Sequence, residues 1–285
     1  MSIPHIVTDT TACLPPQIAA QYDIPIIPQI IHFGEQTFRS GVDLSLAEFM
    51  RRLRTGPDQP KTAAPPPEYF AQVFERLLSD GAPILCLHPS AEISGTVRSA
   101  QLAAQNFPQA DIRVLDTRLI ASPLGQLVSL AAALARQGLG ADEIQAQVMA
   151  LAGRARILFL VDTLDFLARG GRIGGAAALA GTLLQIKPIL TLRDGKVEPL
   201  ERSRTMARAL QHLTSLVIRG YPADGTPGYL SILHADAETR ARSLAADLHT
   251  RLALKDEIPI VDMPPAIVTH VGPGVLGAAF FTGAA

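Results

Sequence analysis

A short polar turn, Ser94-Gly95-Thr96, lies in the stretch HPSAEISGTVRSA between an apolar run and a segment with a helical pattern. Free backbone N–H groups at a helix start, a glycine and two hydroxyls can together hold an anion. An ordinary helix cap uses the same residue types. The two interpretations differ in one respect, which is whether further polar groups converge on the turn.

Other polar residues in loops or at expected strand ends could supply such groups: Thr62 in KTAAPPP, Arg172 in ARGGRIGG and His270 in VTHVGPG. Their simpler interpretations are a linker residue, a surface charge and a hydrogen-bonded histidine at a strand end. His270 is the strongest candidate, because the GPG that follows it forms a rigid turn that fixes the direction of the imidazole. Asp9 closes the first expected strand, at the edge where open α/β sheets bind ligands, or it serves as an N-cap.

Several catalytic and cofactor motifs can be excluded. Gly272-x-Gly274-x-x-Gly277 matches a dinucleotide-binding pattern, but only residues 278–285 follow it, too few for a crossover helix and a second strand. We therefore expect no NAD or FAD. The sequence also lacks GxxxxGK[ST], GxSxG, HExxH and a CxxC pair, so we expect no metal and no cofactor. A serine hydrolase that uses Ser94, His270 and an aspartate stays open, because triads are defined by geometry.

The first half of the chain alternates short apolar runs with helical patterns. The runs IPHIVT, ILCLH and IRVLDT are followed by PPQIAAQYD, the segment after Ser94, and PLGQLVSLAAALARQG. This alternation is typical of βαβ units with a parallel sheet. Ser45 and Glu48 form a capping box before a helix to Thr55, and GPDQPKTAAPPP is expected to be a stiff connector.

The pattern changes near residue 160. KPILTL-RDG-KVEPLE predicts a hairpin with Asp194-Gly195 at its tip, and the runs GYLSILHA and IVTHV flank a helix over 236–251. The predicted fold class is α/β with two domains: an N-terminal parallel-sheet α/β domain, residues 1–160, and a C-terminal α+β domain, residues 161–285. A ligand is expected to bind between them.

Composition narrows the class of partner. The formal net charge is −1, with 48% hydrophobic and 18% charged residues, so no basic excess is present to hold nucleic acid. The N-terminus lacks the pattern of a signal peptide, and no run of about 18 apolar residues occurs. Cys13 and Cys86 have no metal-site spacing. A soluble, cytoplasmic protein is expected.

The motifs taken together resemble the DegV family of bacterial fatty-acid-binding proteins, which includes the carrier subunits of fatty acid kinase. The resemblance runs nearly end to end. It rests on VTDTTACLP, the SGT turn with its helix, VLDTRLIASPLGQLV, LDFLARGGRIGGAAALAGTLLQIKPILTLRDGKVEPLERSRT and HVGPGVLGAAFF. The most specific parts are the GGRI segment with its lysine-proline strand and the His-x-Gly-Pro-Gly turn.

The resemblance implies a non-catalytic carrier that binds one long-chain fatty acid, such as palmitate, stearate or oleate. The carboxylate would be held by Thr62, Ser94 and His270, with the Gly95 amide helping and Arg172 close to the head group. The carrier would take the acid from a membrane surface and present it to a separate fatty acid kinase, for acyl-phosphate formation in phospholipid metabolism. Exposed Arg169 and Arg202 would dock that kinase.

This sequence departs from the family pattern after Thr62. A small polar residue, glutamine and proline are usual there, whereas Ala63, Ala64 and Pro65 follow here. The head group would therefore depend more on Ser94 and His270. Besides the hydrolase, a small-anion sensor without a lipid stays an alternative.

Overall fold

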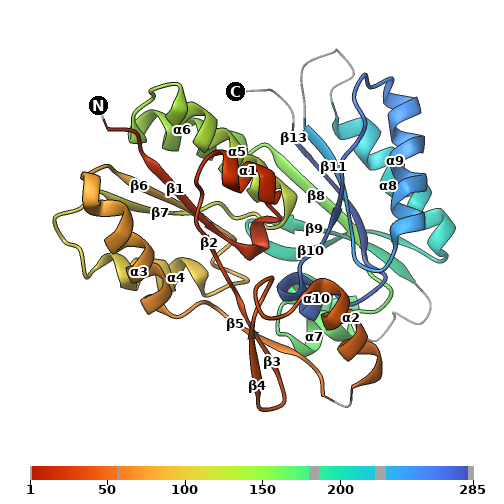
Figure 1. Cartoon of the computed structure of the whole chain (residues 1–285). Helices are drawn as coiled ribbons and strands as arrows, with labels where there is room; N and C mark the ends of the chain where they lie inside the picture. Colours follow the sequence, from red (N-terminus) through yellow and green to blue (C-terminus); the bar gives the residue numbers. More distant parts are fainter. Residues whose placement is uncertain (1, 57, 180–185, 222–228, 282–285) are drawn as a thin grey trace. The chain divides into compact units, whose positions relative to one another are not determined.

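The computed structural model describes all residues except 1, 57, 180–185, 222–228 and 282–285, and it divides into two compact units (Figure 1). The first unit comprises Met1–Gly153 with Pro264–Ala266, and the second comprises Arg154–Met263 with Ile267–Ala285. Part of the long motif at 164–205, namely 180–185, therefore lies outside the described residues, as does the first residue of the run 228–235.

The first unit contains a four-stranded parallel sheet in the order β2-β1-β6-β7. The predicted βα alternation is confirmed, since all three expected apolar runs form strands of this sheet. Strand β6 is buried along its whole length, as a parallel strand covered on both faces should be. The strands are β1 (His5–Asp9), β2 (Ile26–Ile27), β6 (Ile84–His88) and β7 (Ile112–Asp116).

Helices cover both faces of this sheet (Figure 1). On one face Val7, Ile84 and Cys86 pack against Phe70 and Phe74 of α3 and against α4. On the other face α5, with α6 beside it, contacts β1 and β6. The helices of this unit are α1 (Pro16–Gln21), α2 (Leu46–Thr55), α3 (Pro67–Leu77), α4 (Thr96–Ala104), α5 (Ser122–Arg136) and α6 (Ala141–Ala152), with 3₁₀ turns at Thr10–Ala12 and Leu78–Asp80.

A small antiparallel sheet, in the order β4-β3-β5, accompanies α2 in this unit. Its strands are β3 (Ile30–Phe33), β4 (Gln36–Arg39) and β5 (Lys61–Ala63). Helix α2 begins after Ser45, whose hydroxyl accepts from the N–H of Glu48, and it ends at Thr55 as predicted. The Glu48 carboxylate pairs with Arg51 and Arg52 on the same helix, so the Glu48 half of the predicted capping box is replaced by ion pairs.

The second unit is built on a mixed six-stranded sheet in the order β10-β9-β8-β13-β11-β12, in which the β11–β12 pair is parallel and the other pairs are antiparallel. The predicted hairpin is confirmed: β9 and β10 pair across Asp194-Gly195, both with positive φ, which favours a tight two-residue turn. The strands are β8 (Ala155–Leu160), β9 (Lys187–Arg193), β10 (Lys196–Ser203), β11 (Tyr229–His234), β12 (Ile260–Asp262) and β13 (Leu276–Phe281).

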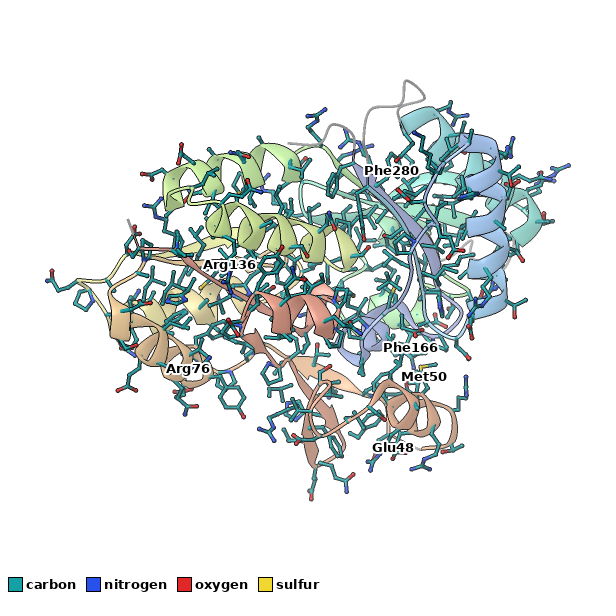
Figure 2. The ribbon with its side chains drawn as sticks, turned by 45° about the horizontal axis from the view of Figure 1, so that its top comes forward. Glu48, Met50, Arg76, Arg136, Phe166 and Phe280 are labelled. Carbon is teal, nitrogen blue, oxygen red and sulfur yellow. The ribbon has the colours of Figure 1, made fainter. Side chains whose placement is uncertain are left out.

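Helices α8 (Met206–Gly220) and α9 (Glu238–Leu252) cover one face of this sheet and share its core. Phe280 of β13, labelled in Figure 2, is buried in that core, with its ring edge-on to Tyr221. Two short helices, α7 (Asp165–Arg169) and α10 (Pro265–Val271), and a 3₁₀ segment at Gly174–Leu179 complete the second half of the chain. None of the helices in the described part of the chain is long and apolar enough to span a bilayer.

Candidate functional site

The Ser94-Gly95-Thr96 turn follows β6 at the carboxyl edge of the parallel sheet and leads into α4, as predicted. Gly95 is the residue before the first helical turn and is exposed, Ser94 is half-buried and Thr96 is fully buried. The Ser94 Oγ lies 2.7 Å from the Thr96 Oγ1 and also accepts from the Thr96 N–H at 3.3 Å. The serine therefore bonds the N–H of the first residue of α4 and still reaches the surface of the unit.

Thr62 belongs to a strand, so the prediction that 56–67 is only a stiff connector was wrong for this segment. Lys61–Ala63 form β5, and Thr62 is paired with Ile31 of β3. The chain after this strand passes the polar turn: a Cβ built on Gly95 would lie 3.4 Å from the Cβ of Ala64. The Thr62 strand and the Ser94 turn are thus neighbouring parts of the first unit.

A buried hydrogen-bond chain supports Ser94 from below. The Gln29 side-chain amide donates to Thr96 Oγ1 at 2.8 Å and to Asp9 Oδ1 at 3.0 Å. Asp9 is also bonded by the N–H and the hydroxyl of Thr11, at 2.9 and 2.6 Å. Asp9, Gln29 and Thr96 are each no more than 3% exposed. Asp9 thus lies fully buried at the carboxyl end of β1, and the N-cap interpretation is confirmed, because its side chain caps the 3₁₀ turn Thr10–Ala12.

His88 completes this internal network. Its Nδ1 lies 2.8 Å from Asp9 Oδ2, and its ring is edge-on to Phe70 with the centroids 5.3 Å apart. Burial alone would raise the pKa of Asp9, but the hydrogen bonds from His88 and Thr11 outweigh burial and hold that pKa below its ordinary value. The carboxylate is thus ionised at neutral pH.

His270 lies in the last turn of α10, so the prediction that 267–271 is a strand was wrong. Pro265 begins this helix and Gly272, with φ of +78°, ends it. The imidazole packs directly on Gly170, where a Cβ would collide with its Nδ1. Burial, and then the charge of Arg172, lower the pKa of His270 from 6.5 to about 4. The side chain is therefore neutral at pH 7.

Arg172 is in the same unit and follows α7. Its N–H donates to the Leu167 carbonyl at 2.9 Å, and its guanidinium donates to the Gly170 carbonyl at 2.6 Å. The Gly170 backbone is thus in contact with both the Arg172 guanidinium and the His270 ring. The second unit brings these two predicted residues to one place.

The Gly-Pro-Gly turn after His270 leads into β13 and not into a helix. A side chain at Gly272 would collide with the Phe166 ring, and one at Gly274 would collide with the Asp162 carboxylate. These glycines therefore allow close packing within the second unit. The turn lacks the helix start that a dinucleotide-binding loop requires.

Arg169 and Arg202 are both exposed. The Arg169 guanidinium lies over the Phe166 ring, 4.8 Å from its centroid, and donates to the Asp165 carbonyl. Arg202 is on β10, opposite Pro188 of β9. Within the described residues, no three His, Cys, Asp or Glu side chains are grouped so that they could hold a metal ion.

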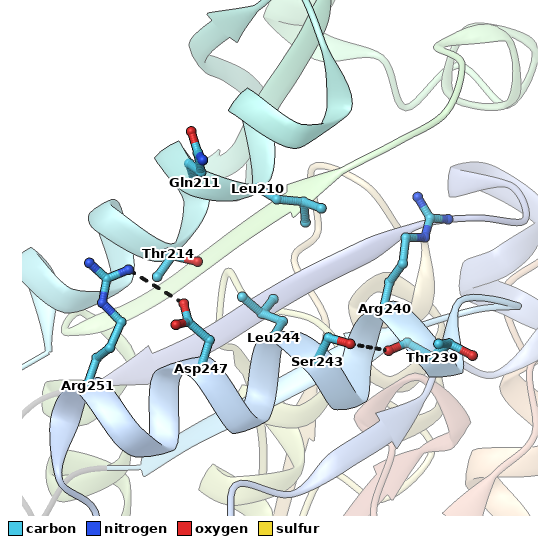
Figure 3. A pocket seen from close by; sticks show the side chains of 9 residues that line it. All are labelled: Leu210, Gln211, Thr214, Thr239, Arg240, Ser243, Leu244, Asp247 and Arg251. Carbon is cyan, nitrogen blue, oxygen red and sulfur yellow. Dashed lines mark hydrogen bonds and ion pairs between the residues drawn. The ribbon is translucent and has the colours of Figure 1, made fainter.

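A groove with a volume of about 290 Å³ lies elsewhere on the second unit, between α8 and α9 (Figure 3). Asp247 and Arg251 form an ion pair along one side of it, and the Ser243 hydroxyl bonds the Thr239 carbonyl. None of the predicted ligand residues lines it. The residues that do are Leu210, Gln211, Thr214, Thr239, Arg240, Ser243, Leu244, Asp247 and Arg251.

Sequence reasoning did not identify Gln29 or His88. It also did not identify Thr96 as the buried residue that joins Gln29 to Ser94 through hydrogen bonds. Gln29 belongs to none of the motifs, and it meets Asp9 and Thr96 only through the fold. Among the predicted ligands, Thr62, Ser94 and Gly95 are in the first unit, and Arg172 and His270 are in the second.

Comparison with known proteins identifies the family. A family model described as "Uncharacterised protein, DegV family" matches residues 4–283. A DegV domain-containing protein of Streptomyces coelicolor is 37% identical over 276 residues, 95% of this chain and 96% of that protein. The structure of a fatty-acid-binding DegV family protein from Thermus thermophilus has 31% identity and a TM-score of 0.88, covering 98% of this chain and 99% of that one.

A stearic-acid-binding protein from Eubacterium ventriosum shares the fold with a TM-score of 0.86 and 26% identity, over 99% of this chain and 98% of that one. Both sequence and fold therefore match along nearly the whole length of the chain. This chain belongs to the DegV family.

Proposed function

We propose that this protein is a non-catalytic carrier of one long-chain fatty acid. The single observation that carries the proposal is the match along the whole chain to a DegV structure that binds fatty acid, at 31% identity. Palmitate, stearate and oleate are the candidate ligands, and stearic acid is the one named for a similar protein. No cofactor or metal takes part in the proposed binding.

The carboxylate is proposed to be held by Thr62, Ser94 and His270, with the Gly95 N–H and Arg172 nearby. A desolvated carboxylate needs its acceptor sites filled, and hydroxyls, a backbone N–H at a helix start and an imidazole N–H can fill them. The neutral state of His270 supports this role, because a neutral imidazole keeps one N–H to donate. The positive charge of Arg172 would add attraction for the anion.

The acyl tail is proposed to supply most of the affinity. At roughly 0.8 kcal/mol per buried CH₂, a chain of about 14 methylenes gives about 11 kcal/mol of gross driving force before the entropy of binding is subtracted. The polar residues then select the head group. This division of labour suits a carrier that must discriminate acids from the other lipids of a membrane surface.

The biological role that we propose is delivery in the cytoplasm. The carrier takes the acid from a membrane surface and presents its carboxylate to a separate fatty acid kinase, which forms the acyl phosphate. Arg169 and Arg202 are proposed to contact that kinase, and both are exposed. The change Arg202→Glu should slow phosphorylation of the bound acid, whereas Arg208→Glu, at an exposed arginine of α8, is the matched control.

The experiment that tests the carrier function is native mass spectrometry of the freshly purified protein, followed by solvent extraction of the released material. A stoichiometric adduct with the mass of a fatty acid, lost on denaturation, is expected, and it would give chain length and unsaturation together. A protein that is free of lipid, and that stays so after incubation with palmitate and oleate, would refute the proposal.

A further inference from the structure

The buried chain Asp9–Gln29–Thr96–Ser94 has a fixed hydrogen-bond direction. The Asp9 carboxylate is ionised and can only accept, so the Gln29 atom that faces it must be the amide nitrogen and not the oxygen. An amide nitrogen has two hydrogens. Gln29 donates one to Asp9 Oδ1 and the other to Thr96 Oγ1.

The direction continues from Thr96 to Ser94. Thr96 Oγ1 accepts from Gln29, and its own hydrogen has Ser94 Oγ, 2.7 Å away, as its acceptor. The reverse arrangement, in which Ser94 donates to Thr96, would leave the Thr96 hydrogen without an acceptor at a fully buried position, which is costly. Ser94 Oγ therefore accepts from the Thr96 hydroxyl and from the Thr96 N–H, and its own hydrogen points away from the network.

The network is held rigidly at its centre. The Gln29 N–H donates to Thr10 Oγ1 at 3.1 Å, and the Gln29 carbonyl accepts from the Ser40 N–H at 2.8 Å. The side chain is 3% exposed, so water does not compete for its amide. The Gln29 amide cannot rotate without losing both of its donated hydrogen bonds.

We propose that Gln29 and Thr96 are positioning residues that make Ser94 a hydrogen-bond donor toward the ligand, so that the site selects an ionised carboxylate over a fatty alcohol. This inference rests on the proposed function. A carboxylate only accepts, and it gains the full bond from a serine whose hydrogen is directed outward. An alcohol both donates and accepts, so it can form a hydrogen bond with Ser94 in either direction, and a fixed direction does not strengthen its binding.

The change Gln29→Glu tests the direction itself, because it is close to isosteric. Beside the Asp9 carboxylate, a buried carboxyl at position 29 should stay protonated, since two like charges cannot both be ionised at that distance. The oxygen that replaces the Gln29 nitrogen would donate its one hydrogen to Asp9, and the same oxygen would accept from the Thr96 hydroxyl. Thr96 would then accept from Ser94, whose hydrogen would turn inward and leave lone pairs facing the ligand.

The assay is isothermal titration calorimetry of the delipidated full-length protein with tetradecanoate and with 1-tetradecanol, each delivered from cyclodextrin. We expect Gln29→Glu to weaken acid binding about tenfold or more and to leave alcohol binding within about twofold. Thr96→Val removes one link of the hydrogen-bond chain without reversing its direction, so it should lower the acid-to-alcohol preference less than Gln29→Glu does. Thr96→Ser keeps the hydroxyl and should keep the wild-type preference. General damage to the fold would weaken the binding of the acid and of the alcohol together.

Thr8→Val is the matched control. Thr8 is also a fully buried threonine of the first unit, but its hydroxyl donates to the Leu87 carbonyl and takes no part in the Asp9–Gln29–Thr96–Ser94 hydrogen-bond chain. It should leave the acid-to-alcohol preference unchanged. A wild-type preference that survives both Gln29→Glu and Thr96→Val would overturn this inference and leave the carrier function intact. Failure of the wild-type protein to bind tetradecanoate would instead refute the carrier function.

Discussion

His270 should titrate far below an ordinary histidine in the ligand-free protein. Burial is the main cause and the charge of Arg172 the second, and together they lower the pKa from 6.5 to about 4. The ring packs on the Gly170 backbone and is largely buried. Arg172→Met should raise the pKa only part of the way, because burial remains.

The low pKa has a defined effect on stability. The unfolded chain takes up this proton first as the pH falls, so the stabilising contribution of neutral His270 is fully present above pH 6.5 and is lost as the pH falls toward 4. The difference between the two pKa values corresponds to about 3 kcal/mol in the free energy of unfolding, of which about 2 kcal/mol should be lost by pH 5.

Proton NMR of the imidazole C2–H measures the pKa directly, with the signal assigned by its loss in His270→Gln. Urea unfolding at about pH 7.5 and about pH 5 should show that the wild type loses about 2 kcal/mol more than His270→Gln on acidification. Saturating oleate should raise the pKa, because a bound carboxylate favours the imidazolium. A midpoint near 6.5 in the delipidated protein would refute the burial argument.

Replacing Ser94 with alanine should weaken fatty acid binding roughly 10- to 100-fold in calorimetry, since a hydrogen bond to a charged group is worth about 1.5–3 kcal/mol; unchanged affinity would remove Ser94 from the proposed site. The wild type should give no burst of nitrophenol with a p-nitrophenyl acyl ester, and a burst abolished by Ser94→Ala would identify a hydrolase instead. Gly170→Ala should weaken oleate binding with little loss of thermal stability, because its Cβ would displace the His270 ring; equal affinity would argue against His270 as a ligand. Gly125→Ala should lower the free energy of unfolding by about 2 kcal/mol, because its Cβ would collide with the Ala12 carbonyl, and a wild-type melting curve would contradict this packing.

The parallel sheet of the first unit could be predicted because its strands are local apolar runs, bounded by turns and followed by helical patterns. The hairpin could also be predicted, because an Asp-Gly pair between two apolar runs favours a two-residue turn. Asp194 and Gly195 have the positive φ that such a turn needs, and the turn determines how β9 and β10 pair. In both cases the decisive information is contiguous in the sequence.

The two errors of secondary structure have different physical causes. In 267–271 the β-branched residues favoured a strand. Pro265 marks the start of a helix and Gly272 marks its end, and these two signals outweighed the strand propensity. In 61–63 the neighbouring prolines masked a strand that exists only because β3 offers it a partner. That partner is some thirty residues away and has no local signature.

The site shows the same limit. Ser94 and Gly95 lie in a glycine-containing turn and His270 lies just before one, and both turns are recognisable as motifs, whereas Gln29 lies in an ordinary segment between two short strands. Its amide matters only because folding brings it between Asp9 and Thr96. A buried residue that determines a hydrogen-bond direction without touching the ligand itself cannot be recognised from a single sequence.

The pairing of Thr62 in β5 determines which changes of length this region can tolerate. Side chains alternate between the faces of a strand, so a shift by one residue would turn Thr62 to the opposite face and put Lys61 or Ala63 in its place. Insertions in the loop before Pro60 should be nearly neutral, because they leave the register of β5 unchanged. A deletion of one residue within 61–63 should abolish the contribution of Thr62 while the rest of the unit still folds.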